Sequence, residues 1–179
     1  MSSKKHIEVL VIGSGPGGYA AAFRAADLGR NVIIVDKDPT LGGVCLNRGC
    51  IPSKTLLHIA KVLDEASSLK KMGVSFTKPK IDIDAVRDWK SKVVTQLSGG
   101  IAQMAKARNV ETIQARASFI SDNEVELDSK TGKQILTFDH CIIAAGSSSS
   151  AVPGIPMDNE NVLTSKTALD LKKIPKKLL

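Results

Sequence analysis

The stretch Ile7-Glu8-Val9-Leu10-Val11-Ile12-Gly13-Ser14-Gly15-Pro16-Gly17-Gly18 decides the fold of this 179-residue chain. Its first half is short, β-branched and mostly apolar, which predicts a strand buried on both faces of a parallel sheet. A glycine-rich turn follows this strand directly. Tyr19 to Leu28 is then rich in alanine and is followed by Gly29, a helix-terminating residue, so it predicts a helix packed closely on the sheet.

A second buried strand is predicted at Val32 to Val35, and Asp36 ends it, which completes a right-handed βαβ unit. In such a unit the first glycine of the turn allows a tight bend, the second lets the backbone approach a pyrophosphate, and the third lets helix and strand pack closely. The pyrophosphate lies at the positive end of the helix dipole. An acid at Asp36 can accept hydrogen bonds from an unphosphorylated ribose. These features predict a dinucleotide site, although they do not separate FAD from NAD; a glycine turn needed only for packing is the alternative.

Cys45 and Cys50 follow the βαβ unit and are separated by four residues. Residues five apart in a regular α-helix lie roughly 8 to 9 Å apart, whereas a disulfide needs Cα atoms within about 7 Å. If the two cysteines bridge, the stretch cannot be regular helix, and we expect a loop or widened turn near Gly49 that leads into a helix near Pro52. A small ring of this kind cycles between disulfide and dithiol. Two buried, unlinked cysteines are the alternative.

The third cysteine, Cys141, is interpreted as a core residue of a buried strand. A zinc site is disfavoured because there is only one closely spaced cysteine pair, and His6, His58 and His140 show no ligand spacing. Three cysteines without a recognisable secretory signal favour a reducing compartment, where structural disulfides are rare. We therefore expect a cytoplasmic location and a chemical function for the cysteine pair.

The rest of the chain changes from a helical to a strand period near residue 110. Leu56, Ile59, Ala60 and Leu63 predict one face of an amphipathic helix over Pro52 to Ser68. The pattern predicts a strand followed by a β-meander after a long helix, and thus an α/β, Rossmann-like domain with a parallel sheet. These further elements are a helix at Ile81 to Ala107 and strands at Val110 to Ala115, Ala117 to Ile120, Glu124 to Leu127, Gln134 to Phe138 and Cys141 to Ala145.

Composition argues against two classes of partner. The formal net charge is +7, but the lysines are scattered in pairs, and aromatic residues make up only 3% of the chain. Scattered charge predicts a solvated surface, and few rings leave few stacking platforms for bases. No apolar run approaches the roughly 20 residues of a membrane-spanning helix. We expect neither a nucleic-acid partner nor a membrane.

Two stretches carry a family resemblance. Gly42-Gly43-Val44-Cys45-Leu46-Asn47-Arg48-Gly49-Cys50-Ile51-Pro52-Ser53-Lys54 resembles the disulfide signature of flavoprotein disulfide reductases. Ile142 to Ser147 is similar to that family's second strand-to-turn motif near the flavin. The choices at Leu46, Ile51 and Ser53-Lys54 resemble dihydrolipoamide dehydrogenases more than glutathione or mercuric reductases. The resemblance covers essentially the whole chain and implies FAD as the bound cofactor, with NAD as the final electron acceptor of the intact enzyme.

The resemblance also implies roles for single residues. Cys45 would be the interchange thiol that forms the mixed disulfide with dihydrolipoamide, and Cys50 would lie beside the isoalloxazine and exchange electrons with it. Asp36 would bind the adenosine ribose, Lys54 would lie near the flavin N5 region, and Ala117 would contact the adenine through its backbone. The implied FAD-binding residues are Gly13, Gly15, Gly18, Asp36, Lys37, Leu41, Gly42, Gly43, Val44, Cys45, Lys54, Ala117 and Gly146.

Some positions depart from the family pattern. Asp36 stands where the family commonly has Glu, Arg48 where a small apolar residue is usual, and Ala117 where Gly is usual. Ser148-Ser149-Ser150 replaces the usual turn sequence after Ser147. Shorter reach at Asp36 and added bulk or charge at the other two positions are expected to alter cofactor affinity or redox poise.

Complete members of the family are much longer, with an NAD domain and a dimerisation domain that supplies a His-Glu acid-base pair to the partner subunit. A general base is needed to deprotonate a dithiol, and no histidine here matches that one. We therefore expect a fragment that is inactive alone, with an FAD-binding domain at residues 1–150, and a linker and the start of the NAD-binding domain at 151–179. The intact enzyme would be a homodimer serving the lipoyl-bearing acyltransferase of a 2-oxoacid dehydrogenase complex. A glutathione- or mercury-type reductase and a non-catalytic flavin-binding module are the alternatives.

Overall fold

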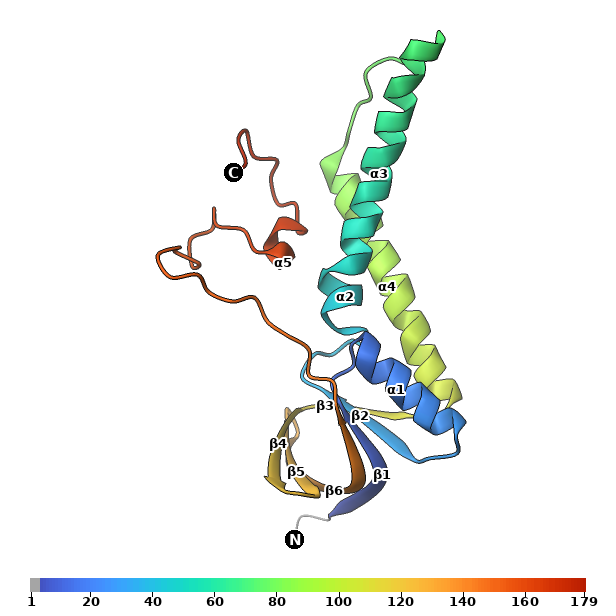
Figure 1. The fold of residues 1–179 in the computed structure, drawn as a ribbon, viewed down its shortest axis with the longest axis vertical. Helices are drawn as coiled ribbons and strands as arrows, with labels where there is room; N and C mark the ends of the chain where they lie inside the picture. Colours follow the sequence, from blue (N-terminus) through green and yellow to red (C-terminus); the bar gives the residue numbers. More distant parts are fainter. Residues whose placement is uncertain (1–3) are drawn as a thin grey trace.

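The computed structural model describes residues 4–179, and within them a mixed sheet organises the fold (Figure 1). Its strands lie in the order β3-β2-β1-β6-β5-β4. The first four are parallel to one another, and β6, β5 and β4 form an antiparallel meander. This confirms the predicted α/β fold with a parallel sheet and a β-meander. The strands are β1 (Lys5–Ile12), β2 (Val32–Asp36), β3 (Glu111–Gln114), β4 (Arg116–Ser121), β5 (Glu124–Ser129) and β6 (Gly132–Ile143).

One strand prediction was wrong, because Gln134 to Phe138 and Cys141 to Ala145 are not two strands. Most of both belongs to β6, which runs unbroken and keeps its register with β1, so that His140 pairs with Val9. Polar residues between the two apolar runs face solvent, and an exposed side chain does not interrupt backbone pairing. The second run is also not buried, since Ile143 is 67% exposed.

Helices cover one face of the sheet and extend beyond it. α3 and α4 form an antiparallel hairpin that projects away from the sheet, and α4 continues unbroken through Gly99-Gly100 (Figure 1). α1 begins at Pro16, earlier than the predicted Tyr19, because proline suits the first turn, where its missing N–H is not needed. The helices are α1 (Pro16–Asp27), α2 (Gly43–Arg48), α3 (Cys50–Ser68), a 3-10 turn η1 (Leu69–Met72), α4 (Ile83–Ala107) and α5 (Ser165–Ala168).

The predicted apolar face of α3 is largely confirmed. Leu56, Ile59 and Leu63 are half-buried, whereas Ala60 is exposed. Among residues 4–179, none of the helices combines the length and the apolar composition needed to cross a membrane.

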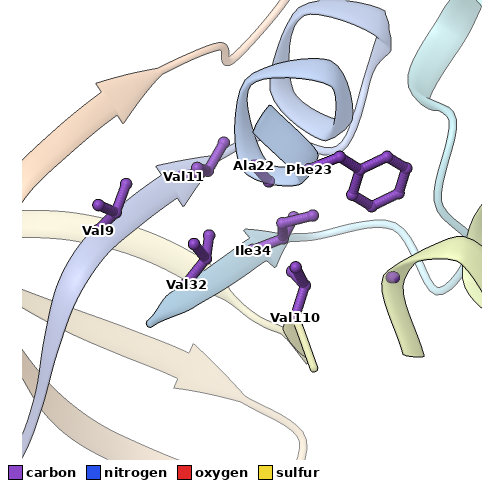
Figure 2. Packing of buried hydrophobic residues seen from close by; sticks show 8 residues of the cluster. Val9, Val11, Ala22, Phe23, Val32, Ile34 and Val110 are labelled. Atoms are coloured by element: carbon purple, nitrogen blue, oxygen red, sulfur yellow. The ribbon is translucent and has the colours of Figure 1, made fainter. Parts of the chain in front are cut away.

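The apolar runs of β1 and β2 are buried on both faces, as predicted. On one face, Val9 and Val11 of β1 pack with Val32 and Ile34 of β2 against α1, α4 and Val110 (Figure 2). On the other face the β-meander folds over the sheet. This second core consists of Leu10, Ile33, Val35, Ala115, Val125, Leu127, Leu136 and Phe138. Two packed faces fix the carboxyl ends of β1 and β2, where the glycine turn and Asp36 lie.

After β6 the chain leaves the sheet and returns to the hairpin. Lys90 Nζ of α4 donates a hydrogen bond to the Leu169 carbonyl at 2.6 Å, and Arg87 Nη1 donates to the Leu171 carbonyl at 3.2 Å. These two cations hold the segment after α5 against α4.

Candidate dinucleotide and disulfide site

The glycine-rich turn is packed too tightly for side chains at its two ends. A Cβ atom on Gly13 would lie 2.1 Å from the Ala144 carbonyl oxygen, just past the end of β6. A Cβ atom on Gly18 would lie 1.8 Å from the Gly13 carbonyl oxygen. Both distances are far below van der Waals contact. Glycine is therefore required at both positions by the way the turn packs between β1, α1 and β6.

The middle of the turn is open by comparison. Gly15 is the N-cap of α1, and the nearest atom to a Cβ there would be the Gly43 Cα at 3.9 Å. No side chain of residues 4–179 caps this helix end, so the N–H groups of its first turn remain free to bind an anion. The arrangement fits a pyrophosphate: the backbone is accessible at Gly15 and the helix N-terminus points toward it.

Asp36 lies at the carboxyl end of β2 and is held by three hydrogen bonds. Its Oδ2 accepts from the backbone N–H of Ser14 at 2.7 Å and from the Ser14 hydroxyl at 2.6 Å, and its Oδ1 accepts from the Asp38 N–H at 2.9 Å. Burial raises the pKa of Asp36, but these hydrogen bonds together outweigh burial and lower the pKa below its ordinary value. The carboxylate is therefore ionised at neutral pH, and Oδ1 keeps a lone pair that a ribose hydroxyl can use.

Sequence reasoning missed Ser14 and Asp38. Ser14 is fully buried, and its hydrogen bonds tie the glycine turn to β2. The Asp36-x-Asp38 spacing was an available signal, because an aspartate often accepts from the N–H two residues further on. Ser14 gave no signal beyond being a small polar residue inside the turn.

Cys45 and Cys50 form a disulfide, with Cα atoms 4.7 Å apart. The argument that a bridge excludes a regular helix is confirmed, because Gly49, with φ −141° and ψ −99°, separates α2 from α3. Of the two expected forms, a loop or a widened turn, the structure shows a break of one residue at Gly49: Cys45 lies within α2, and α3 begins at Cys50, two residues before the predicted start near Pro52. One non-helical residue brings the two Cα atoms within reach, so no longer loop is needed.

The segment that leads into the disulfide ring lies directly against the glycine turn. A Cβ atom on Gly43 would be 2.6 Å from the Gly15 Cα, and the Gly42 N–H donates to the Ser14 carbonyl at 2.9 Å. From inside the ring, Asn47 Nδ2 donates to the carbonyls of Leu41 and Gly43 at 3.1 and 3.0 Å. These contacts bring the dinucleotide motif and the cysteine pair together in one site.

The other residues predicted for this loop differ in exposure. Leu41 is half-buried and packs against the core between the sheet and helices α1 and α4, whereas Val44 is 51% exposed. Lys37 is exposed, and its carbonyl accepts from Gln114 Nε2 at 3.2 Å. The Lys37 side chain therefore points to solvent while its backbone joins the end of β2 to the end of β3.

Three predicted residues lie outside this cluster. Lys54 is exposed on α3, about one turn after Cys50, and makes no ion pair within residues 4–179. Ala117 pairs with Leu127 in the meander and is half-buried. Gly146 is exposed just beyond β6, with no atom within 4 Å of a Cβ built there. Among residues 4–179, no side-chain hydrogen bond or ion pair joins these three residues to the disulfide ring.

A cavity of about 850 Å³ opens beside Asp36, between β3 and α4. It is lined on the loop side by Asp38 and Leu41 and on the α4 side by Gly99 and Lys106. The described residues of the glycine turn do not line it. The cavity therefore gives room next to the Asp36 carboxylate and not at the pyrophosphate position.

The third thiol is separate from this site. Cys141 is free and half-buried. It packs against the second core, on the face of the sheet that the β-meander covers, which agrees in part with its interpretation as a core residue. Burial raises the pKa of Cys141, so its thiol stays protonated and unreactive at neutral pH. Within residues 4–179, no group of three His, Cys, Asp or Glu side chains is arranged to hold a metal ion.

Fold and site together define a nucleotide-binding α/β domain that carries a disulfide beside its glycine turn. The family model described as pyridine nucleotide-disulphide oxidoreductase matches residues 7–179, and the chain belongs to this family. Within it, the chain is similar to curated dihydrolipoyl dehydrogenases.

Three of these relatives show the extent of the similarity. The protein of Vibrio cholerae is 50% identical over 179 residues, which are all of this chain and 38% of the relative. That of Haemophilus influenzae is 48% identical over 180 residues, again all of this chain and 38% of the relative. Dihydrolipoyl dehydrogenase 2 of Haloarcula marismortui is 43% identical over 175 residues, 96% of this chain and 37% of the relative. The chain thus spans less than two fifths of the length of these relatives.

Proposed function

We propose that this chain is the FAD-binding, redox-disulfide part of a dihydrolipoyl dehydrogenase, which oxidises dihydrolipoamide with NAD as the final acceptor. The observation that carries the proposal is the Cys45–Cys50 disulfide held against the glycine turn, in a chain whose whole length is similar to dihydrolipoyl dehydrogenases. A disulfide closed over a sequence separation of 5 constrains little of the unfolded chain. Its place beside a nucleotide site favours electron exchange over a structural role.

The binding roles follow from the geometry of the turn. Gly13, Gly15 and Gly18 let the backbone approach the FAD pyrophosphate, and Asp36 accepts hydrogen bonds from the adenosine ribose. The ionised state of Asp36 supports this role. The loop from Lys37 to Val44, together with Lys54, Ala117 and Gly146, supplies the remaining cofactor contacts in this proposal.

Cys45 and Cys50 carry the chemistry. A substrate thiolate attacks Cys45 Sγ and breaks the bond to Cys50 Sγ, which leaves a mixed disulfide and a Cys50 thiolate. The second substrate thiol then displaces Cys45, so that lipoamide leaves as a closed disulfide and the protein holds the two electrons as a dithiol. Bound FAD supplies the acceptor for this electron pair, and the helix N-terminus at Cys50 favours the thiolate beside it.

Deprotonation of the substrate thiol needs a general base. His6 lies at the amino end of β1, away from the site, and His140 is exposed in mid-strand. His58 is eight residues along α3 from Cys50, a rise of roughly 12 Å. Because none of these histidines lies at the site, we follow the resemblance to flavoprotein disulfide reductases and assign the base to the partner subunit of a homodimer.

The wider assignments belong to the same proposal. Residues 1–150 form the FAD-binding domain, and residues 151–179 form a linker and the start of an NAD-binding domain. The complete enzyme works in the cytoplasm on the lipoyl group of the acyltransferase of a 2-oxoacid dehydrogenase complex. The 179-residue chain alone is expected to give no lipoamide-to-NAD turnover.

The test is to titrate purified chain with dihydrolipoamide or glutathione, with and without added FAD, and count thiols after denaturation. The oxidised chain should show one thiol, from Cys141, and the reduced chain three. Dihydrolipoamide should reduce the pair. Preferential reduction by glutathione would favour the glutathione-type alternative, and a pair that no dithiol reduces would favour the non-catalytic module.

The two cysteines should also differ once FAD is bound. In Cys45→Ser the remaining Cys50 thiolate should retain a long-wavelength absorbance band with the flavin, whereas Cys50→Ser should remove that band. The reason is the proposed order of the pair, with Cys50 next to the cofactor. Equal loss of the band in both variants would contradict the assignment.

A further inference from the structure

Arg48 lies inside the disulfide ring, between Cys45 and Cys50. Its guanidinium does not extend into solvent. Nη2 pairs with Asp38 Oδ2, and the two side chains are only 31% and 23% exposed. Arg48 belongs to α2, and Asp38 belongs to the loop after β2, so the ion pair joins the ring to that loop.

The ion pair continues a hydrogen-bonded connection to the glycine turn. The Asp38 N–H donates to Asp36 Oδ1, and Asp36 Oδ2 accepts from Ser14. Arg48 is thereby held in one position relative to both the cysteines and the dinucleotide turn. A fixed charge at this place acts on the sulfur atoms in a defined direction.

The charge acts only on the reduced form of the ring. A disulfide carries no charge, whereas the dithiol produced by reduction can lose a proton to become a thiolate. Cys45 and Arg48 are three residues apart in α2, so their side chains are neighbours on one face of the helix. The guanidinium therefore stabilises the reduced state, and the Asp38 carboxylate beside it opposes that effect.

We infer that Arg48 and Asp38 form a charge-balanced positioning pair that sets the reduction potential of the Cys45–Cys50 couple. The inference rests on the proposed function in one respect, namely that this disulfide cycles. Other charges near Arg48 are Lys90 of α4 and Lys166 and Asp170 of the C-terminal segment, which line with it a cavity of about 240 Å³. Lys54 follows on α3. These groups are unchanged in every variant below and cancel in the comparison.

The experiment equilibrates the purified chain with dithiothreitol and its cyclic disulfide at neutral pH. Dithiothreitol gives up two electrons and two protons as it closes, and the Cys45–Cys50 bond takes both electrons and one or two of the protons. Arg48→Met removes the cation and keeps an aliphatic side chain of similar length. It should lower the equilibrium constant for reduction about threefold, as expected for a part-exposed charge. Asp38→Asn should raise it by about the same factor.

Two further variants make the test decisive. Arg48→Met combined with Asp38→Asn removes both charges and should return the constant to near its original value. Lys61→Met is the matched control, because Lys61 pairs with Glu65 at 3.6 Å on α3, away from the ring, and should leave the constant unchanged. A merely structural role would shift both single variants in the same direction.

The outcomes separate this inference from the proposed function. Opposite shifts in the single variants with recovery in the double variant support the charge pair. Unchanged or same-direction shifts overturn it while leaving a cycling disulfide in place. If dithiothreitol does not reduce the pair even in the unchanged chain, the proposed function fails and the inference fails with it. If Arg48→Met does not fold, Asp38→Asn against the unchanged chain still gives the sign of the charge effect: a raised constant supports the inference, and an unchanged or lowered constant overturns it.

Discussion

The glycine turn and the α3–α4 hairpin use the same residue type under opposite packing. Gly18 in the turn has a backbone oxygen 1.8 Å from where a Cβ would stand, whereas Gly100 in mid-α4 has no atom within 4 Å of that position. Both belong to Gly-Gly pairs inside helical segments. The contrast shows that a glycine pair can mark a close approach of two backbone segments in one region, whereas in another region it occupies ordinary helix positions where a side chain would fit.

The largest effect should come from Gly18→Ala. The added methyl group would overlap the Gly13 carbonyl, and neither backbone can move without disturbing β1 or α1, so the free energy of unfolding should fall by about 3 kcal/mol, the upper end of the usual cost of overpacking. Urea unfolding followed by circular dichroism measures this loss. Gly17→Ala is the control, because a Cβ there meets only the Ala144 Cβ at 4.0 Å, an ordinary contact. Similar losses in the two variants would show that the close approach is not the cause.

A smaller effect is expected from Asp36→Asn. The three hydrogen bonds to the carboxylate favour its charged form, so the neutral amide should lower the free energy of unfolding by about 1 kcal/mol at neutral pH, a figure kept small by solvent around the part-exposed group. Urea unfolding at several pH values measures it.

The same substitution carries a pH signature. The pKa of Asp36 is lowered in the folded state, so its stabilisation is fully present above the ordinary value of 3.8 and is lost as the pH falls through the lower folded-state value. The difference between the unchanged chain and Asp36→Asn should therefore shrink below pH 3.8. A difference that stays constant across this range would rule out the ionised carboxylate as its source.

The sequence predicts the layered fold well because periodicity follows burial. The β1 and β2 segments are buried on both faces, and their unbroken apolar runs predict this burial directly. The same reasoning splits β6 in two, since it detects side chains that face solvent and not the backbone pairing that continues past them. Where burial and pairing diverge, as at His140, a pattern of side chains misplaces the strand end.

The candidate site is predicted less completely. The glycine spacing and the cysteine pair are local patterns, and both lead to the correct region. The Ser14–Asp36 and Asp38–Arg48 contacts join segments from different elements, so they depend on how the fold brings those elements together. Gly49 shows a third limit: one residue with non-helical angles satisfies the disulfide, and spacing alone cannot say how short such a break is.

The smallest effect sharpens the contrast between the two regions. Gly100→Ala should raise the free energy of unfolding by about 0.5–1 kcal/mol, because alanine favours the helix and finds free space. Gly73, after η1, also has free space around it, but its φ of +87° disfavours any side chain. Gly73→Ala should therefore lower the same free energy by about 1 kcal/mol. Urea unfolding of the two variants measures opposite signs at two open sites. A loss of stability in both would mean that α4 is under constraint near Gly100, and the hairpin would then resemble the glycine turn more closely than its open packing indicates.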